Sequence, residues 1–570
     1  MVSSTSIRSL RRIDAALILG LVLVAAVIPL LTSAFAGSLE IPRNDDWSYR
    51  RIAQVFADTG RLEMDGAAET TLIGQILLTQ PLVWLSSGQP LGFAVAGFLF
   101  AITAAIGAYA LARQLLPPRR AIVAALMLPL FPGYLAYATS YMNDVPALAA
   151  QFGCVALGAF AISRRPLSFG WLVVAVGVGC LAFSIRNFGL AAPVAVLTGA
   201  LFAQPRRPRN WVLSVGAAGV CVGIQMFRSS LPGQLGHVGL DIGFAAQIPT
   251  ALVTVALVAL PACLVAIAIS GRYWRRRDIG LGLIVGLIVV ALHVARWVRL
   301  GTFPQALMRN LVTQQGAPDA GYVLGQRPVL FDESAWAALN LIALASVVVV
   351  AGAAFGVMGM YARSSAGSSW RRLAWAGTPQ GVVAVFTLLA AGGLALVSLV
   401  LPVFDRYLWP ILPPLAAILM ADPPAGSRAV ETPSHWAWMT GAAAIADVGL
   451  LAIVAGIFMT NTNAFDAARW TAGDRLVSAG ISANQIDAGY EWVGFHATQT
   501  PDPTAPEPGP IWYRGWWRGF EACGVASSGP VDLEDGVLVG KVPYRLELVV
   551  GPVVELWLYK IESSACEFAG

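Results

Sequence analysis

An acidic pair, Asp45 and Asp46, follows the first apolar run of the chain, within the stretch 43–49 that reads RNDDWSY. One carboxylate at such a place can act as a general base on an acceptor hydroxyl or amine, while the other orients the acceptor or helps to hold a cation. A short acidic side chain before a helical segment can instead cap the free amides of that helix. Both roles stay open for Asp45.

A further carboxylate, Asp144, lies in the segment NDVP at 143–146, where Pro146 is suited to the first turn of a helix. Helix capping is again the simpler interpretation. However, an ionisable group at a membrane boundary costs free energy unless it is paired, solvated or used. Two acidic segments on one membrane face can converge on a basic or metal centre, so Asp46 and Asp144 are candidate ligands of a divalent ion.

Two arginines are the candidate partners of a phosphate. Arg186 lies between two apolar runs with almost no loop, which holds its guanidinium near the headgroup level. Arg406 follows Asp405 in the segment FDRYLWP at 404–410. Guanidinium groups suit phosphate recognition. The alternatives are contact of Arg186 with lipid phosphates and a local salt bridge between Asp405 and Arg406.

Metal and nucleotide motifs are weak or missing. The four histidines show no ligand spacing for a structural zinc site, although His237, near Asp241, is a candidate substrate-binding residue. No Walker loop or dinucleotide fingerprint is present. The sequence therefore predicts no cofactor other than, at most, a divalent metal ion.

The elements that must position these residues are membrane helices. The chain has 570 residues, of which 57% are hydrophobic and only 12% are charged, whereas soluble domains carry about 25% charged residues. Runs of about 20 apolar residues recur until residue 460. The net charge of +5 resides in short basic clusters between these runs, which indicates cytoplasmic loops rather than a nucleic-acid surface.

Threading helices between the basic clusters predicts about thirteen transmembrane spans, the first an uncleaved anchor rather than a signal peptide. The spans are 13–36, 91–116, 121–139, 145–163, 168–185, 188–204, 210–228, 246–270, 279–299, 336–361, 380–402, 409–422 and 436–460. This topology places the C-terminus and the candidate site residues on the extracytoplasmic side of a plasma or inner membrane.

We expect two domains. Residues 1–460 form a polytopic all-α membrane domain, whose first external loop, 37–90, carries interfacial helices: an amphipathic one around 50–59 and a second one at 72–85 that is broken by Pro81. Residues 461–570 form a small extracytoplasmic α/β domain with strands near 537–542, 545–550 and 553–559.

Two groups of residues in this tail have open roles. Cys523 and Cys566 can pair if the tail faces an oxidising compartment, or remain a reduced buried pair. Four tryptophans either stack on sugars or form the core of the tail, and the core is the preferred interpretation: Trp492, Trp512, Trp516 and Trp517.

The motifs together resemble GT-C superfamily glycosyltransferases, in particular the family 39 type protein mannosyltransferases and the lipid A aminoarabinose transferases. The stretch 45–49 is similar to their Asp-acidic-x-x-Tyr motif, with Asp where many relatives have Glu at 46. Residues 143–146 resemble a Thr-Asp-x-Pro-like segment, with Asn in place of Thr, and 406–410 resemble an Arg-Tyr-x-x-Pro stretch. Residues 486–492 also look like a segment that follows the spans in bacterial members.

The resemblance implies transfer of a sugar from a polyprenyl monophosphate donor to an extracytoplasmic glycan, lipid or protein acceptor, with inversion at the anomeric carbon. Asp45 would then be the general base, Asp46 its neighbour, and Asp144 a support for the site or for a divalent ion. Tyr49 and Tyr407, which belong to the matching motifs, are candidate substrate-binding residues. We assign the donor phosphate to Arg186 and Arg406.

Two other functions remain possible. A transporter or flippase of a lipid-linked saccharide would carry buried charges in mid-span and paired broken helices. A wall-assembly scaffold would bind glycan through the tail tryptophans.

Overall fold

The computed structural model of the chain describes most of its residues. These are 4–68, 70–233, 247–301, 305–316, 322–364, 375–399, 401–424, 434–503, 505, 511–547, 551–563 and 566. His237 and Asp241 therefore lie outside the described residues.

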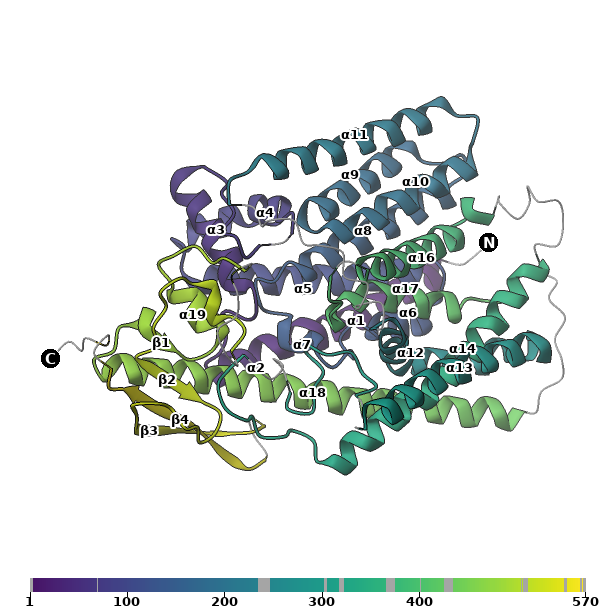
Figure 1. Cartoon of the computed structure of the whole chain (residues 1–570). Coiled ribbons are helices and arrows are strands. Elements are labelled where there is room, and N and C mark those ends of the chain that lie inside the picture. Colours follow the sequence, from purple (N-terminus) through teal and green to yellow (C-terminus); the bar gives the residue numbers. More distant parts are fainter. Residues whose placement is uncertain are drawn as a thin grey trace.

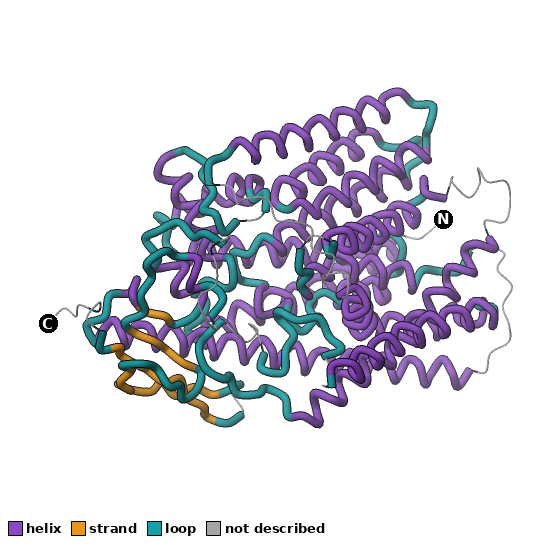
Figure 2. The backbone as a smooth tube through the Cα atoms, in the orientation of Figure 1, coloured by secondary structure: helices purple, strands orange, loops and turns teal. Residues whose placement is uncertain are grey.

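Helices dominate the chain and run side by side in a bundle (Figures 1 and 2). The first α-helices along the chain are α1 (Ser4–Val22), α2 (Ile28–Ala36), α3 (Asp46–Thr59), α4 (Ile73–Leu85), α5 (Pro90–Arg113), α6 (Pro118–Leu126), α7 (Tyr134–Tyr137), α8 (Asp144–Ser163), α9 (Phe169–Ile185) and α10 (Ala191–Ala203). They are followed by α11 (Pro208–Ser230), α12 (Ile248–Ser270), α13 (Arg276–Leu300), α14 (Glu333–Ser364), α16 (Pro379–Val397), α17 (Leu412–Leu419), α18 (Ser434–Ser478) and α19 (Tyr490–His496).

Short irregular helices complete the bundle. A π-helical segment, η1 (Leu23–Val27), joins α1 to α2, and the 3₁₀ segments are η2 (Asn187–Leu190), η4 (Gly271–Tyr273), η5 (Trp375–Gly377), η6 (Asp405–Ile411), η7 (Ala483–Gln485) and η8 (Arg514–Trp516).

Within the described residues, nine helices are long and apolar enough to cross a membrane. They correspond to nine of the expected spans, and two further ones, 168–185 and 188–204, are apolar helices of at most 17 residues. The chain is thus a polytopic helical membrane protein, as the composition predicts. The expected spans 121–139 and 409–422 are not continuous helices: α6 ends at Leu126 and α17 covers only Leu412–Leu419. Pro129 and Pro132 follow the end of α6 and cannot donate a helical hydrogen bond, while Pro413 and Pro414 lie in the first turn of α17, directly after η6.

The first loop folds as the sequence predicts, into two helices at one end of the bundle. α3 buries Trp47, Tyr49 and Ile52, and α4 contains Pro81. Figure 1 places α3, α4, α19 and the sheet together at the left end, away from the connection between α10 and α11, which carries the basic residues 206 and 207.

The tail forms a four-stranded sheet in the order β1-β2-β4-β3. Its strands are β1 (Ile486–Asp487), β2 (Gly524–Ser527), β3 (Gly536–Arg545) and β4 (Val553–Ile561). β1 runs parallel to β2, and the other pairs are antiparallel. The expected strand 545–550 is not formed where it is described, because Arg545 ends β3 and 546–547 form a bend.

The junction between the two expected domains is a continuous helix. α18 passes through residue 460 and ends at Ser478, and its last turns pack on the sheet. A disulfide joins Cys523 to Cys566. The division at 460 stays a prediction, but the tail is attached to the bundle by a rigid element.

Close packing under the first loop sets the position of Asp144. α8 packs against α5, α9, α10 and α16. Gly97 on α5 faces the turn before α8, and a Cβ atom at this glycine would lie 2.6 Å from the carbonyl oxygen of Ser140. A side chain there would push the turn, and with it the start of α8, away from α5.

Candidate active site

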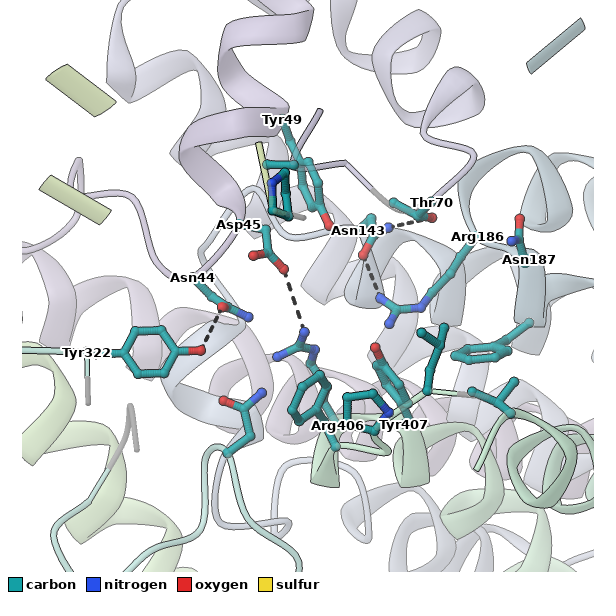
Figure 3. A pocket seen from close by; sticks show the side chains of 18 of the residues that line it. Asn44, Asp45, Tyr49, Thr70, Asn143, Arg186, Asn187, Tyr322, Arg406 and Tyr407 are labelled. Atoms are coloured by element: carbon teal, nitrogen blue, oxygen red, sulfur yellow. Dashed lines mark hydrogen bonds and ion pairs between the residues drawn. The ribbon is translucent and has the colours of Figure 1, made fainter. Parts of the chain in front are cut away.

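A cavity of about 420 Å³ lies where the first loop, the bundle and the tail meet (Figure 3). It contains five of the predicted site residues on its lining, namely Asp45, Tyr49, Arg186, Arg406 and Tyr407. The lining also includes Asn44, Asn143, Asn310, Tyr322, Trp512 and Trp516. Segments that lie far apart in the sequence therefore share one site.

Asp45 is the residue before α3, but its side chain makes no capping hydrogen bond. The carboxylate turns instead toward the cavity, where Oδ2 lies 3.7 Å from Nη2 of Arg406 and Oδ1 accepts a hydrogen bond of 3.1 Å from the Tyr490 hydroxyl. Asn44, directly before it, has a φ of 55°, which turns the chain into α3. The backbone conformation starts the helix without a side-chain cap, so the Asp45 carboxylate is available to a ligand in the cavity.

The electrostatics of Asp45 suit a base. Burial raises the pKa of its carboxyl above the ordinary value, while Arg406 and the hydrogen bond from Tyr490 each offset part of that rise. Asp144 adds to the rise by like-charge repulsion. A carboxylate with a raised pKa is a stronger base than one in water.

Asp144, the first residue of α8, is the centre of a second set of contacts. Its Oδ1 lies 2.6 Å from Nη1 of Arg186, and its Oδ2 lies 3.6 Å from Nε of Arg406. The same Nη1 of Arg186 donates to the side-chain oxygen of Asn143 at 2.6 Å, and Asn143 donates to Thr70. Asp144 thus orients the two arginines.

Both guanidinium groups lie near the ring of Tyr407. Arg186 lies over the Tyr407 ring at 4.7 Å and Arg406 at 5.5 Å. Stacking on an aromatic face fixes the plane of a guanidinium group and leaves its edge free to bind a planar or tetrahedral anion.

Asp405 does not form the local salt bridge that the sequence allows. Its Oδ2 accepts from the backbone amides of Leu311 and Val312 at 2.7 and 2.8 Å, and its Oδ1 accepts from the amide of Arg406. Burial raises the pKa of Asp405 to about 7 in spite of these hydrogen bonds. Asp405 therefore fixes the segment 305–316 beside the cavity and leaves the Arg406 side chain to the site.

Asp46 lies outside the cavity, which corrects the expectation that it works beside Asp45. It is fully buried and binds Arg50, with Nε donating to Oδ1 at 2.5 Å and Nη2 to Oδ2 at 2.9 Å. Oδ2 also accepts from the amide of Tyr141 at 3.0 Å. Successive helical residues point in different directions, so only one of the acidic pair can face the cavity.

The predicted metal ligands do not converge. Asp46 is paired with Arg50 and Asp144 with Arg186, so each carboxylate already has a cationic partner. Among the described residues, no group of three His, Cys, Asp or Glu side chains could hold a metal ion. The residues present do not fit a divalent ion, and no step below uses one.

Sequence reasoning missed several residues of the site. Tyr490 on α19 holds Asp45, and Tyr322, hydrogen-bonded to Asn44, lies beside it. Asn310 is buried with a φ of 130°, and its Nδ2 has no hydrogen-bond partner among the described residues. Strained backbone of this kind is frequent at functional sites. No local sequence pattern predicts the positive φ of Asn310 or the contact of Tyr490, in the tail, with Asp45 in the first loop.

Comparison with known families agrees with the motifs. Residues 84–231 match the family model described as dolichyl-phosphate-mannose-protein mannosyltransferase. This segment contains Asn143, Asp144 and Arg186 but not Asp45 or Arg406. No curated protein matches the chain.

Solved structures with some likeness include the oligosaccharyltransferase of Archaeoglobus fulgidus, with a TM-score of 0.38, 13% identity and coverage of 85% of this chain and 59% of that one. The chain thus spans about three fifths of the archaeal enzyme's length. ArnT from Cupriavidus metallidurans, solved bound to undecaprenyl phosphate, has a TM-score of 0.36 and 9% identity, with coverage of 95% and 98%.

The family match confirms the resemblance drawn from the motifs: over residues 84–231, the chain is similar to the dolichyl-phosphate-mannose-protein mannosyltransferase family of GT-C glycosyltransferases.

Proposed function

We propose that this protein transfers a sugar from a polyprenyl monophosphate donor to a hydroxyl of an extracytoplasmic acceptor. Asp45 is the general base, and Arg186 and Arg406 bind the donor phosphate. The family match over residues 84–231 supports the class of reaction, and the geometry of the cavity supports these roles.

The state of Arg406 is the observation that carries the proposal. Its side chain is only 5% exposed, yet its Nε has no hydrogen-bond partner among the described residues. Its contacts with Asp45 and Asp144, at 3.7 and 3.6 Å, are longer than hydrogen bonds. Nη1 and Nη2 lie 2.7 and 3.2 Å from the side-chain amide of Asn44, whose oxygen accepts from both in the orientation that satisfies this amide. Nε is therefore the unused donor of a buried cation, and a phosphate oxygen supplies its missing acceptor.

An apolar cavity next to this site suits the lipid part of such a donor. It has a volume of about 230 Å³ and lies between α12, α16 and α17. Its wall includes Leu394, Ser398 and Val403, while the neighbouring residues Val397, Leu401 and Phe404 line the site with the arginines. An isoprenoid chain can pass along this segment with its phosphate at Arg406.

The reaction is a single displacement. The acceptor oxygen forms a bond to the anomeric carbon while the bond from that carbon to the phosphate oxygen breaks, and the acceptor proton passes to Asp45. The polyprenyl phosphate leaves with the electron pair of the broken bond, and the fixed charges of Arg186 and Arg406 stabilise the negative charge that develops on it. Attack from the side opposite the leaving group inverts the anomeric centre.

Binding of polyprenyl phosphate tests the donor site without the need to know the sugar. The purified protein in lipid nanodiscs should bind undecaprenyl phosphate, and Arg406→Ala and Arg186→Ala should each weaken binding at least about tenfold, because each removes charge-assisted hydrogen bonds. Arg518→Ala is the matched control, since Arg518 is 85% exposed in the tail. Equal affinity in Arg406→Ala and wild type would contradict the proposed phosphate site.

A further inference from the structure

Four aromatic side chains, Tyr322, Tyr490, Trp512 and Trp516, pack together beside Asp45, and we refer to them as the aromatic cluster. The centroid of Trp512 lies 4.9 Å from that of Tyr490, 5.0 Å from Trp516 and 5.5 Å from Tyr322. Three of the four, Tyr322, Trp512 and Trp516, line the cavity. The cluster therefore forms a wall of the site.

The structure divides the four tail tryptophans into two classes. Trp492 and Trp517 are 1% and 3% exposed and belong to the hydrophobic core of the tail. Trp512 and Trp516 are half-buried and line the cavity. Trp512 and Trp516 also pack against the core cluster that contains Trp517. Unlike Trp492 and Trp517, however, they keep exposed indole surface on the cavity lining.

Asp45 lies between this wall and the arginines. Tyr490 of the cluster donates a hydrogen bond to Oδ1 of Asp45, while Oδ2 of the same carboxylate faces Arg406. Figure 3 shows Tyr322 and Arg186 at opposite sides of the cavity with Asp45 between them. In a displacement with inversion, the acceptor and the leaving phosphate lie on opposite sides of the anomeric carbon. If the phosphate is at the arginines, the acceptor is at the aromatic wall.

We propose that Trp512 and Trp516 bind a sugar ring of the acceptor, so that the acceptor of this protein is a carbohydrate. The inference rests on the proposed function, because it uses the arginines to fix the donor side. The C–H groups of a sugar ring carry partial positive charge and pack on the electron-rich face of an indole. The hydroxyls of the same ring find polar partners in the side chains of Asn44 and Asn310, which also line the cavity.

The chemistry of the wall favours a saccharide over a polypeptide acceptor. One common mode holds an extended peptide through its backbone at an exposed strand edge. None of the described lining residues belongs to a strand, and this side of the cavity is built from aromatic and amide side chains. The wall also carries no acidic residue besides Asp45 among the described lining residues, so no second carboxylate is there to hold an amine acceptor. A neutral hydroxyl-bearing ring matches all of these groups.

Saturation-transfer difference NMR can test this inference with simple probes. The full-length protein in nanodiscs is mixed with methyl glycosides of common hexoses and pentoses at millimolar concentration. Wild type should transfer saturation to the ring protons of at least one glycoside. Trp512→Ala and Trp516→Ala should each raise its apparent dissociation constant about tenfold, and Trp516→Phe should restore part of the affinity, because a smaller aromatic face remains.

The control variant is Trp438→Ala, since Trp438 is 75% exposed on α18 outside the tail, and it should bind glycoside as wild type does. Equal glycoside binding by wild type, Trp512→Ala and Trp516→Ala would overturn the inference. So would the absence of binding to any glycoside, or glycosylation of Ser- and Thr-containing peptides at equal rates by wild type and both variants.

Binding of undecaprenyl phosphate separates this inference from the proposed function. The tryptophan variants should bind that lipid as wild type does, since the arginines are unchanged. If wild type binds the lipid but the tryptophan variants bind glycoside as well as wild type does, the proposed acceptor site is refuted and the proposed donor site is not. Tryptophan-dependent glycoside binding without any lipid binding supports the sugar site but refutes the donor site on which the proposed acceptor role rests.

Discussion

At the scale of single residues, the acidic pair has two different tasks. Asp45 faces the cavity and contacts Arg406 and Tyr490, while Asp46 is buried against Arg50. The sequence could predict that the carboxylates at 45 and 144 and the arginines at 186 and 406 share one face, because each lies at the same end of an expected span. It could not predict which acidic neighbour faces the site, since that depends on the rotation of α3 about its axis.

The pH dependence of transfer should report the ionisation of Asp45. The base works only when deprotonated, so the rate falls as the pH is lowered through the raised pKa of Asp45. Tyr490→Phe removes a hydrogen bond that favours the charged form. The acid limb of the pH–rate profile should therefore move to higher pH, and the rate at acidic pH should fall several-fold more in Tyr490→Phe than in wild type.

The matched control is Tyr544→Phe, because Tyr544 lies on β3 outside the cavity lining. A shift of the acid limb to lower pH in Tyr490→Phe, or an equal shift in both variants, would contradict the role of Tyr490 in holding Asp45. Since Tyr490 touches the base and not the reacting atoms, we regard it as a positioning residue.

At the scale of elements, a buried ion network ties the first loop to the tail. Arg43 binds Asp466 on α18 at 2.8 Å, and Arg469 binds both Asp466 and Glu491 of α19 at 2.9 and 2.7 Å. Glu491 in turn accepts from the backbone amide of Asn44 at 3.0 Å. The network fixes α19, and therefore Tyr490, relative to Asp45. Arg43 and Asn44 lie more than 400 residues before their partners in the network, so no local pattern predicts these contacts.

Local patterns were sufficient for α3, whose apolar residues recur at helical spacing, and for most of the membrane helices. They failed at 121–139 and 409–422, where apolar composition suggested spans but the α-helices are short: α6 ends at Leu126, and α17 begins only at Leu412 and ends at Leu419. They also failed at the middle tail strand, where β3 simply runs on to Arg545. Apolar composition indicates that a segment is removed from water, but it does not predict how long the helix in that segment is.

The ion pair between Asp46 and Arg50, in the first turns of α3, should matter for stability rather than for the transfer reaction. Asp46→Ala leaves the Arg50 guanidinium buried without its counter-ion, which lowers the free energy of unfolding by about 3–5 kcal/mol. The backbone amide of Tyr141 also loses its hydrogen-bond acceptor. Thermal unfolding in detergent should show a clearly lower midpoint for Asp46→Ala. Asp45→Ala is the matched neighbour, and its midpoint should stay close to that of wild type because the Asp45 side chain is 25% exposed. Equal midpoints for the two variants would contradict this division.

At the scale of the whole molecule, the fold places the tail sheet and the cavity at one end of the bundle and the basic α10–α11 connection at the other (Figure 1). Figure 1 shows the sheet and α19 at the end opposite the α10–α11 connection. The positive-inside rule favours a cytoplasmic position for that connection, and we therefore propose that the cavity opens on the extracytoplasmic side. A polyprenyl donor could then reach Arg406 from the outer leaflet.

Cysteine labelling in intact cells should confirm this orientation. α11 joins the exposed residues Arg206 and Ser230, so these two positions should lie on opposite sides of the membrane. Ser230→Cys should react with a membrane-impermeant maleimide, and Arg206→Cys should react only after the cells are opened. The free cysteines at 154, 180, 221 and 263 are buried and should give little background. The reverse labelling pattern would place the cavity in the cytoplasm and contradict the proposed site of transfer.

The most direct measurement is transfer of label from polyprenyl-phosphate donors that carry a radioactive hexose or pentose, in membranes containing wild type or Asp45→Asn. Asparagine preserves the shape of the side chain but cannot take the proton, so the rate should fall by about 10²-fold or more while undecaprenyl phosphate is still bound. Transfer by Asp45→Asn at the wild-type rate would contradict the central claim. So would movement of the donor across the membrane by wild type with its sugar intact.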